Sequence, residues 1–190
     1  VIAFDTGPGN MVIDALTEIL FNKPFDRDGH IAASGKVLVP PLRDLMRHQY
    51  FRKHPPKTAG RAEFGREYVQ LFLRKCGAAD KRGMITTATA LTAHSIADAL
   101  RRFTAKGRYK EFIVSGGGAK NPTLLAMLAN QLTPLGLKIR LSDDFGIPSE
   151  AKEAVAFALL AYQTWHRKPS NITSATGAKR PAILGKVSYV

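Results

Sequence analysis

The sequence predicts an α/β fold, in which short strands lead into glycine loops and the loops open helices. Two apolar runs, at residues 1–4 and 111–114, are each followed by a glycine-rich loop that ends at an asparagine. Asparagine favours helix N-termini, and an apolar pattern at helical spacing follows each one. A third apolar run, at 138–141, precedes another long helical pattern. This alternation is typical of a sheet flanked by helices, and we expect the sheet to be mixed.

The expected elements can be assigned in order along the chain. Helices are assigned from apolar residues at helical spacing, and strands from short apolar runs bounded by turn-forming residues. In order, we expect a strand at 1–4, helices at 11–21 and near 41–46, helical spacing from 68 to 72, a helix at 85–103, a strand at 111–114, a helix at 122–132, a strand at 138–141, a helix at 149–165 and a short strand at 182–187.

Two of these regions carry expectations about burial. Residues 50–65 are rich in basic side chains and are broken by proline and glycine, so we expect this segment to be exposed. The helix at 149–165 is apolar almost all round, and a helix of that kind is normally buried.

Length and composition limit the class of protein. A chain of 190 residues suits one domain or two small ones, and it has no apolar stretch of about 18 residues, so no membrane span is expected. The single cysteine, Cys76, excludes an internal disulfide and favours a reducing, cytoplasmic location. The chain has no starting Met and opens on a strand pattern, which favours the second part of a longer protein.

The chain is strongly basic, with 28 Lys and Arg against 15 Asp and Glu. Eleven basic and four acidic residues lie between Arg43 and Arg82. A solvated face and a surface that attracts a small polyanion both fit this excess. Nucleic acid is not an expected partner, because no zinc-finger spacing, basic-region heptad or RNA-binding aromatic signature accompanies the charge.

The loop in "FIVSGGGAKNP" is a candidate phosphate site. Gly116, Gly117 and Gly118 allow close backbone approach, and Asn121 caps a helix whose free N–H groups favour anions. The loop lacks the end of a Walker A motif. A dinucleotide site is a weaker interpretation, supported by Asp143 after the next strand but opposed by Asn121 at the place of the third glycine. A tight turn without a ligand is the structural alternative.

The loop in "FDTGPGN" places Asp5 at the carboxyl end of a predicted strand, where open α/β sheets bind ligands. Gly7 and Gly9 keep the loop bare, and Asn10 is placed to cap the next helix. A carboxylate here suits a general base or a magnesium ligand. The alternative is that Asp5 only braces its own turn.

Three further charged residues are candidates. Glu153 lies in a helix expected to be buried, which suits a metal ligand or an ion pair with Lys152, Lys120 or an arginine. Lys57 and Arg61 lie in a glycine-containing loop, where they would contact an anionic or hydroxyl-rich substrate or, as spacing alone favours, serve as surface charges.

These motifs together resemble the anhydro-N-acetylmuramic acid kinases and the related fungal levoglucosan kinases. The resemblance covers residues 4–187 and rests on "FDTGPGNMVIDAL", "DRDGHIAASGKV", "PPKTAGRAEF", "TATALTAHSIADAL", "GGGAKNPTLLAML", "GIPSEAKEAVAFALLA" and "LGKV", in that order. It implies an RNase H-like domain of the acetate and sugar kinase/Hsp70/actin superfamily, with ATP and sugar held between two such domains.

The resemblance also implies roles for the candidate residues. Asp5 would be the base that activates water to open the anhydro bridge at C1 while O6 takes the γ-phosphate, and Asp5 and Glu153 would hold Mg²⁺. Lys57 and Arg61 are the candidate substrate-binding residues in the motif that lies on the sugar side. One motif departs from the family, because its "TGRE" reads Ala-Gly-Arg-Ala at 59–62. The residues expected to bind the nucleotide are Gly7, Gly9, Asn10, Gly116, Gly117, Gly118 and Asn121.

By this resemblance, residues 1–190 are the C-terminal domain of a two-domain kinase whose N-terminal domain is missing. We expect the fragment alone to be inactive and treat a homodimer as one assembly to test. The alternatives are a levoglucosan kinase and a non-catalytic nucleotide-binding remnant.

Overall fold

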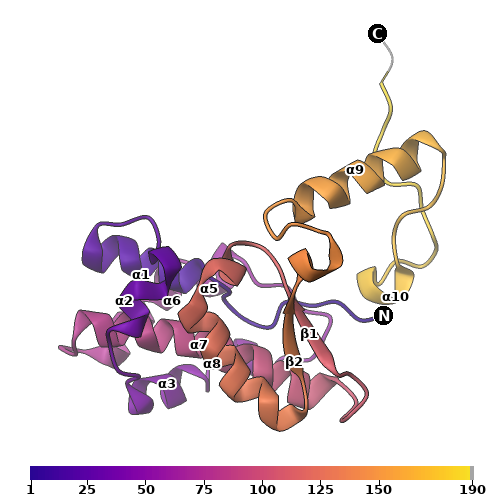
Figure 1. Ribbon diagram of the computed structural model, residues 1–190. Coiled ribbons are helices and arrows are strands. Elements are labelled where there is room, and N and C mark those ends of the chain that lie inside the picture. The colour runs from indigo at the N-terminus through magenta and orange to yellow at the C-terminus, as the bar shows by residue number, and fades with distance from the viewer. Residues whose placement is uncertain (189–190) are drawn as a thin grey trace.

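The computed structural model describes residues 1–188 of the chain (Figure 1). It is an α/β structure in which helices greatly outnumber strands. The α-helices are α1 Met11–Phe21, α2 His30–Ala33, α3 Val39–Leu45, α4 Gln49–Arg52, α5 Arg61–Phe64, α6 Arg66–Cys76, α7 Lys81–Phe103, α8 Pro122–Leu132, α9 Lys152–Trp165 and α10 Thr173–Thr176. The strands are β1 Glu111–Val114 and β2 Lys138–Leu141, and short 3₁₀ turns occupy Arg27–Gly29, Gly117–Lys120, Thr133–Leu135 and Ser142–Phe145.

Helix α7 forms the centre of the molecule, and α1, α2, α3 and α8 pack around it. Its middle is buried on all sides, as the full burial of Ile85, Leu91 and Ala93 shows. The helix begins four residues before its predicted start because Asp80 caps it, accepting a 2.9 Å hydrogen bond from the Gly83 N–H. The predicted helix is confirmed, and the loop at residues 5–10 packs against its middle.

The segment from residue 50 to residue 65 was expected to be exposed, and this is true of only part of it. Arg52, Lys53 and Arg61 are exposed. Tyr50, Phe51 and Phe64 are instead buried in the main core, where their rings meet in edge-on and tilted contacts. Even Lys57 is only 8% exposed. The prolines and glycines interrupt regular structure here, while the aromatic residues between them supply the apolar area that folds the segment inward.

The sheet has two parallel strands among the described residues, with Glu111 opposite Lys138 and Val114 opposite Leu141. Both strands match their predicted bounds. Phe112 and Ile139 pack with Leu124, Leu128 and Leu132 of α8 on one face. Asn121 caps α8 as predicted, accepting a 2.9 Å hydrogen bond from the Leu124 N–H.

Three sheet predictions were wrong. Residues 1–4 and 182–187 form no strand, and the sheet is parallel and two-stranded in the described residues, not mixed. A strand exists only where a neighbour pairs with it, and the side chains of Val1 and Ile2 are instead 81% and 58% exposed. The side chains of Val1 and Ile2 are therefore not covered by the described residues.

The position of α9 also differs from the prediction. The helix was expected to be buried, but it contains no buried residue and lies apart from the helices around α7 (Figure 1). Phe157 is 70% exposed and Trp165 is 65% exposed. The helix itself was predicted correctly, although it starts at Lys152 because residues 149–151 form a turn. Within residues 1–188, none of the helices is both long and apolar enough to cross a membrane.

Candidate functional site

The loop from Asp5 to Asn10 lies directly on the middle of α7. The Thr92 hydroxyl donates a 2.7 Å hydrogen bond to the Gly9 carbonyl. Gly7 fits against Ser95 so closely that a Cβ at residue 7 would lie 2.8 Å from the Ser95 Cβ. Gly9 has φ +55°, a left-handed conformation that favours glycine. Gly7 is therefore required by the close contact of the loop with α7, and Gly9 is favoured by its left-handed backbone conformation.

Asp5 is exposed, and one segment of the chain fixes three of its atoms. The Asp5 N–H donates to the Lys57 carbonyl at 3.0 Å, and the Tyr50 hydroxyl donates to the Asp5 carbonyl at 2.7 Å. The Ala59 N–H donates to Oδ2 of the carboxylate at 2.7 Å. The other carboxylate oxygen, Oδ1, has no hydrogen bond among the described residues, so it is the oxygen available to a ligand.

The two glycine loops meet at the side chain of Asn10. A Cβ at Gly118 would lie 3.5 Å from the Asn10 Oδ1, and one at Gly117 would lie 3.8 Å from its Nδ2. Gly116 has φ +81°, and its N–H donates to the Ser149 carbonyl at 3.0 Å. The sequence placed these loops separately, about 110 residues apart, and the structure brings them together at the starts of α1 and α8.

A third loop, residues 26–29, packs against the start of α8. The Thr123 hydroxyl donates a 2.9 Å hydrogen bond to the Gly29 carbonyl. The Asp26 carboxylate accepts hydrogen bonds from the N–H groups of Ile31 and Ala32 in the first turn of α2. The DRDG motif therefore supports the loops around α8.

Lys120 is an exposed cation beside these loops. Its ammonium pairs with Glu150, and the hydrogen bond to Glu150, together with the charges of Glu150, Asp28 and Asp143, raises the pKa of Lys120. The hydroxyl and the N–H of Ser149 donate hydrogen bonds to the Asp143 carboxylate. These bonds hold the pKa of Asp143 below its usual value. The Asp143 carboxylate is thus occupied within its own turn, which does not favour a ribose-binding role.

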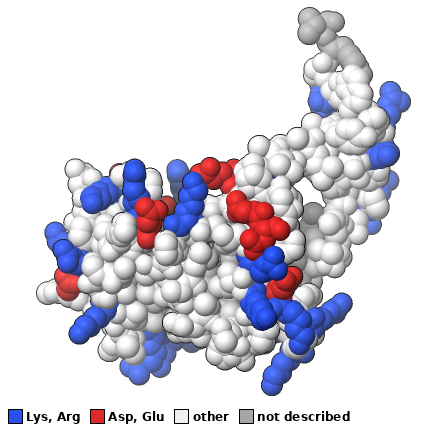
Figure 2. All heavy atoms as spheres, in the orientation of Figure 1, with Lys and Arg blue, Asp and Glu red and all other residues white. Residues whose placement is uncertain are grey.

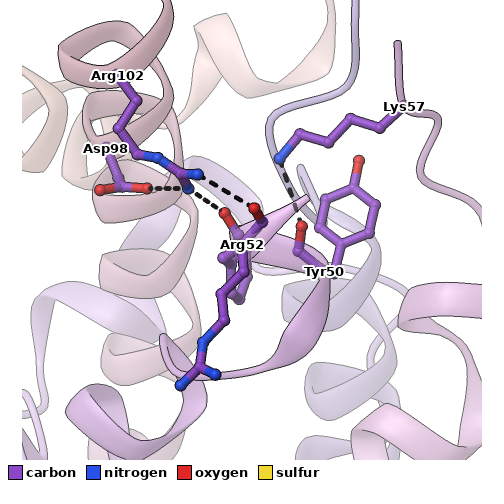
Figure 3. Close-up of polar contacts among 6 residues, drawn as sticks. Tyr50, Arg52, Lys57, Asp98 and Arg102 are labelled. Atoms are coloured by element: carbon purple, nitrogen blue, oxygen red, sulfur yellow. Dashed lines mark hydrogen bonds and ion pairs between the residues drawn. The ribbon is translucent and has the colours of Figure 1, made fainter. Parts of the chain in front are cut away.

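Lys57 and Arg61 are placed differently from each other. The Lys57 ammonium points inward, donates to the Tyr50 carbonyl at 3.4 Å and lies 4.7 Å from the centre of the Tyr50 ring (Figure 3). Burial, followed by the nearby Arg102 charge, lowers the pKa of Lys57.

Arg61 instead starts α5 and faces an open hollow of about 930 Å³, which Asp14 also lines. Burial raises the pKa of Asp14 to about 6, and the Asp26 charge adds to the effect.

Glu153 lies in the first turn of exposed α9, and no hydrogen bond joins it to Asp5 among the described residues. Residues 1–188 contain no group of three or more His, Cys, Asp or Glu side chains placed to hold a metal ion. Magnesium in phosphate-transferring sites is usually held by one or two carboxylates together with the nucleotide phosphates, so such a cluster is not needed for it.

Charged side chains of both signs occupy the face in Figure 2. Lys and Arg are spread over that face, with Asp and Glu among them. Several pairs join opposite charges, including Arg140 with Glu111 and Asp144. This arrangement fits a solvated surface.

An α/β protein with glycine loops meeting at helix N-termini belongs to a class that commonly binds phosphate groups. Comparison with known proteins narrows this class. The model of the anhydro-N-acetylmuramic acid kinase family matches residues 1–190. An anhydro-N-acetylmuramic acid kinase of Bacillus cereus is 45% identical over the whole chain, and one of Bacillus thuringiensis (strain Al Hakam) is 44% identical. The chain belongs to this family.

The chain spans about half the length of the curated relatives it matches, covering 50% of the first and 49% of the second. This agrees with the expectation that it is one part of a longer protein. Its assignment as the C-terminal domain stays a prediction.

Sequence reasoning missed two contributors to the site, Tyr50 and the main-chain N–H of Ala59. Tyr50 lies in a basic, aromatic stretch with no motif, 45 residues from the atom it binds. The backbone group of Ala59 has no sequence signal at all. Only the fold reveals them.

Proposed function

We propose that the chain is part of an ATP-dependent kinase that opens the ring of a 1,6-anhydrosugar and phosphorylates O6, with anhydro-N-acetylmuramic acid as the sugar. The observation that carries the proposal is that the two glycine loops meet at the side chain of Asn10. Asp5 begins the first of these loops, residues 5–10. Family membership supports the reaction class, because the relatives are named for this kinase activity.

In the proposed reaction, Asp5 is the general base. Its Oδ1 takes a proton from a water molecule, the water oxygen attacks C1, and the bond between C1 and O6 breaks. The freed O6 then bonds to the γ-phosphorus of ATP, and ADP leaves. Oδ2 is held by the Ala59 N–H and remains a hydrogen-bond acceptor throughout. A base fixed through one oxygen keeps the other in position for proton transfer.

The glycine loops are proposed to hold the nucleotide. Gly7, Gly9 and Asn10 lead into α1, and Gly116–Gly118 and Asn121 lead into α8. Bare backbone next to two helix N-termini offers N–H donors and positive dipole ends to phosphate oxygens. Magnesium would enter with the nucleotide, and Asp5 and Glu153 remain its predicted ligands. Arg61 remains a predicted sugar contact, whereas the buried ammonium of Lys57 supports an internal role.

We further propose that this half has the RNase H-like fold and needs the rest of the polypeptide to enclose the sugar. Two surfaces support a covering partner. The apolar side chains of α9 are exposed, and a hollow of about 810 Å³ lies between residues 2–6 and β1. The fragment alone is then expected to be inactive. A homodimer and a cytoplasmic location also stay predictions.

A phosphotransfer assay on the full-length protein tests the proposal. ATP and magnesium are supplied with anhydro-N-acetylmuramic acid in one reaction and levoglucosan in another, and the 190-residue chain is run beside it. Phosphorylation of the amino sugar by the long form alone is the expected result. Turnover of levoglucosan alone would reassign the sugar, and ATP binding without turnover of either sugar would favour the non-catalytic remnant.

A further inference from the structure

The three hydrogen bonds of Asp5 all join it to residues 50–59, so the position of the proposed base depends on that segment. Two of these bonds come from main-chain groups, which no single substitution removes cleanly. The third comes from a side chain, the hydroxyl of Tyr50. Tyr50 is therefore the point at which the support of Asp5 can be altered without changing Asp5.

Tyr50 is a fixed donor. Its ring is 1% exposed and packs edge-on against Phe64 with centroids 4.9 Å apart. Burial, together with the Asp5 and Glu63 charges, raises the pKa of Tyr50 to about 12, so the hydroxyl keeps its proton at neutral pH. A buried, protonated phenol whose ring is held by its neighbours has little freedom to leave the Asp5 carbonyl.

The backbone around Tyr50 is anchored from two sides. Lys57 donates to the Tyr50 carbonyl, and the Arg102 guanidinium of α7 donates to the carbonyls of Phe51 and Arg52 (Figure 3). Arg102 also pairs with Asp98, one turn earlier on α7. The central helix thus fixes the segment that fixes Asp5.

We propose that Tyr50 is a positioning residue for the phosphotransfer reaction, holding the main chain of Asp5 so that Oδ1 stays directed at the reacting water. The inference rests on the proposed function for the role of Asp5. Tyr50 itself does not contact the substrate. Its removal would loosen Asp5, and a displacement of about 1 Å at a reacting group can cost a hundredfold in rate.

The test compares Tyr50→Phe with Tyr68→Phe in the full-length protein. Tyr68 is a matched control, because it is 4% exposed, packs against the same Phe64 ring and has a buried hydroxyl with no hydrogen-bond partner in the described part of the chain. Tyr50→Phe is expected to lower kcat about 10- to 100-fold while KM for sugar and ATP stays within about twofold. Tyr68→Phe is expected to leave both constants unchanged.

Hydrogen exchange provides a second readout that does not require activity. In Tyr50→Phe the Asp5 amide is expected to exchange about 3- to 10-fold faster, and in Tyr68→Phe at the wild-type rate. Wild-type kcat and exchange in Tyr50→Phe would overturn the inference. If the unaltered protein phosphorylated neither sugar, the proposed function would fail, and the exchange result alone would decide whether Tyr50 holds Asp5.

Discussion

Replacement of Gly7 by alanine should destabilise the protein through steric overlap, mainly with the side chain of Ser95. The new Cβ would lie 2.8 Å from the Ser95 Cβ and 3.2 Å from Cε1 of Phe51, and nearer still to the Ser95 hydroxyl. Carbon atoms pack best at roughly 3.5–4.0 Å, so the loop must move off α7 by several tenths of an ångström. Ser95 and Phe51 are 2% and 4% exposed, and neither has space to retreat. We expect a loss of about 2 kcal/mol in the free energy of unfolding.

Denaturant unfolding of the full-length protein measures this loss, and a second background isolates its cause. Ser95→Gly removes the two nearest atoms, so Gly7→Ala should cost less than about 1 kcal/mol in that background. Gly9→Ala is the matched control, because its Cβ would meet no atom within 4 Å and its cost of about 1 kcal/mol would come from the positive φ alone. Equal costs of Gly7→Ala in the two backgrounds would refute the reasoning.

Two further predictions concern stability. Because the pKa of Asp14 rises from 3.8 in the unfolded chain to about 6 in the folded one, the folded state holds more protons between these values and stability falls as pH rises through that window. Asp14→Asn should therefore add about 1 kcal/mol at pH 7 and nothing near pH 3, allowing for partial solvent screening, and unfolding at both pH values checks this. Asn121→Ala should cost about 1 kcal/mol through loss of the α8 cap, and an unchanged unfolding midpoint would contradict it.

The elements that sequence predicted well are those whose signals are local. The helix at 122–132 has its cap, its initial proline and its apolar face within a dozen residues, and β1 and β2 are bounded by turn residues. Helix α9 was found for the same reason. Its exposure could not be predicted. An apolar pattern indicates that a helix favours burial, but it does not show whether another part of the chain covers it.

The candidate site divides in the same way. Glycine and asparagine have conformational signatures, so the two loops were recognisable, and Asp5 was found from its place after an apolar run. Their meeting at Asn10 depends on how α1 and α8 pack around α7, which no short stretch of sequence encodes. The inward direction of Lys57 depends on the rings of Tyr50 and Phe103, of which Phe103 is distant in sequence, so it could not be predicted from the local sequence either.

The most direct test of the central claim is the rate of phosphate transfer to anhydro-N-acetylmuramic acid by the full-length protein and by its Asp5→Asn variant. The amide keeps the size of the carboxylate and can still accept the Ala59 hydrogen bond, so the fold should be preserved while the base is lost. We predict a fall in kcat of roughly a thousandfold, within the range that general bases contribute, with an unchanged unfolding midpoint. Full activity in the folded Asp5→Asn protein would contradict the assignment of Asp5 as the base.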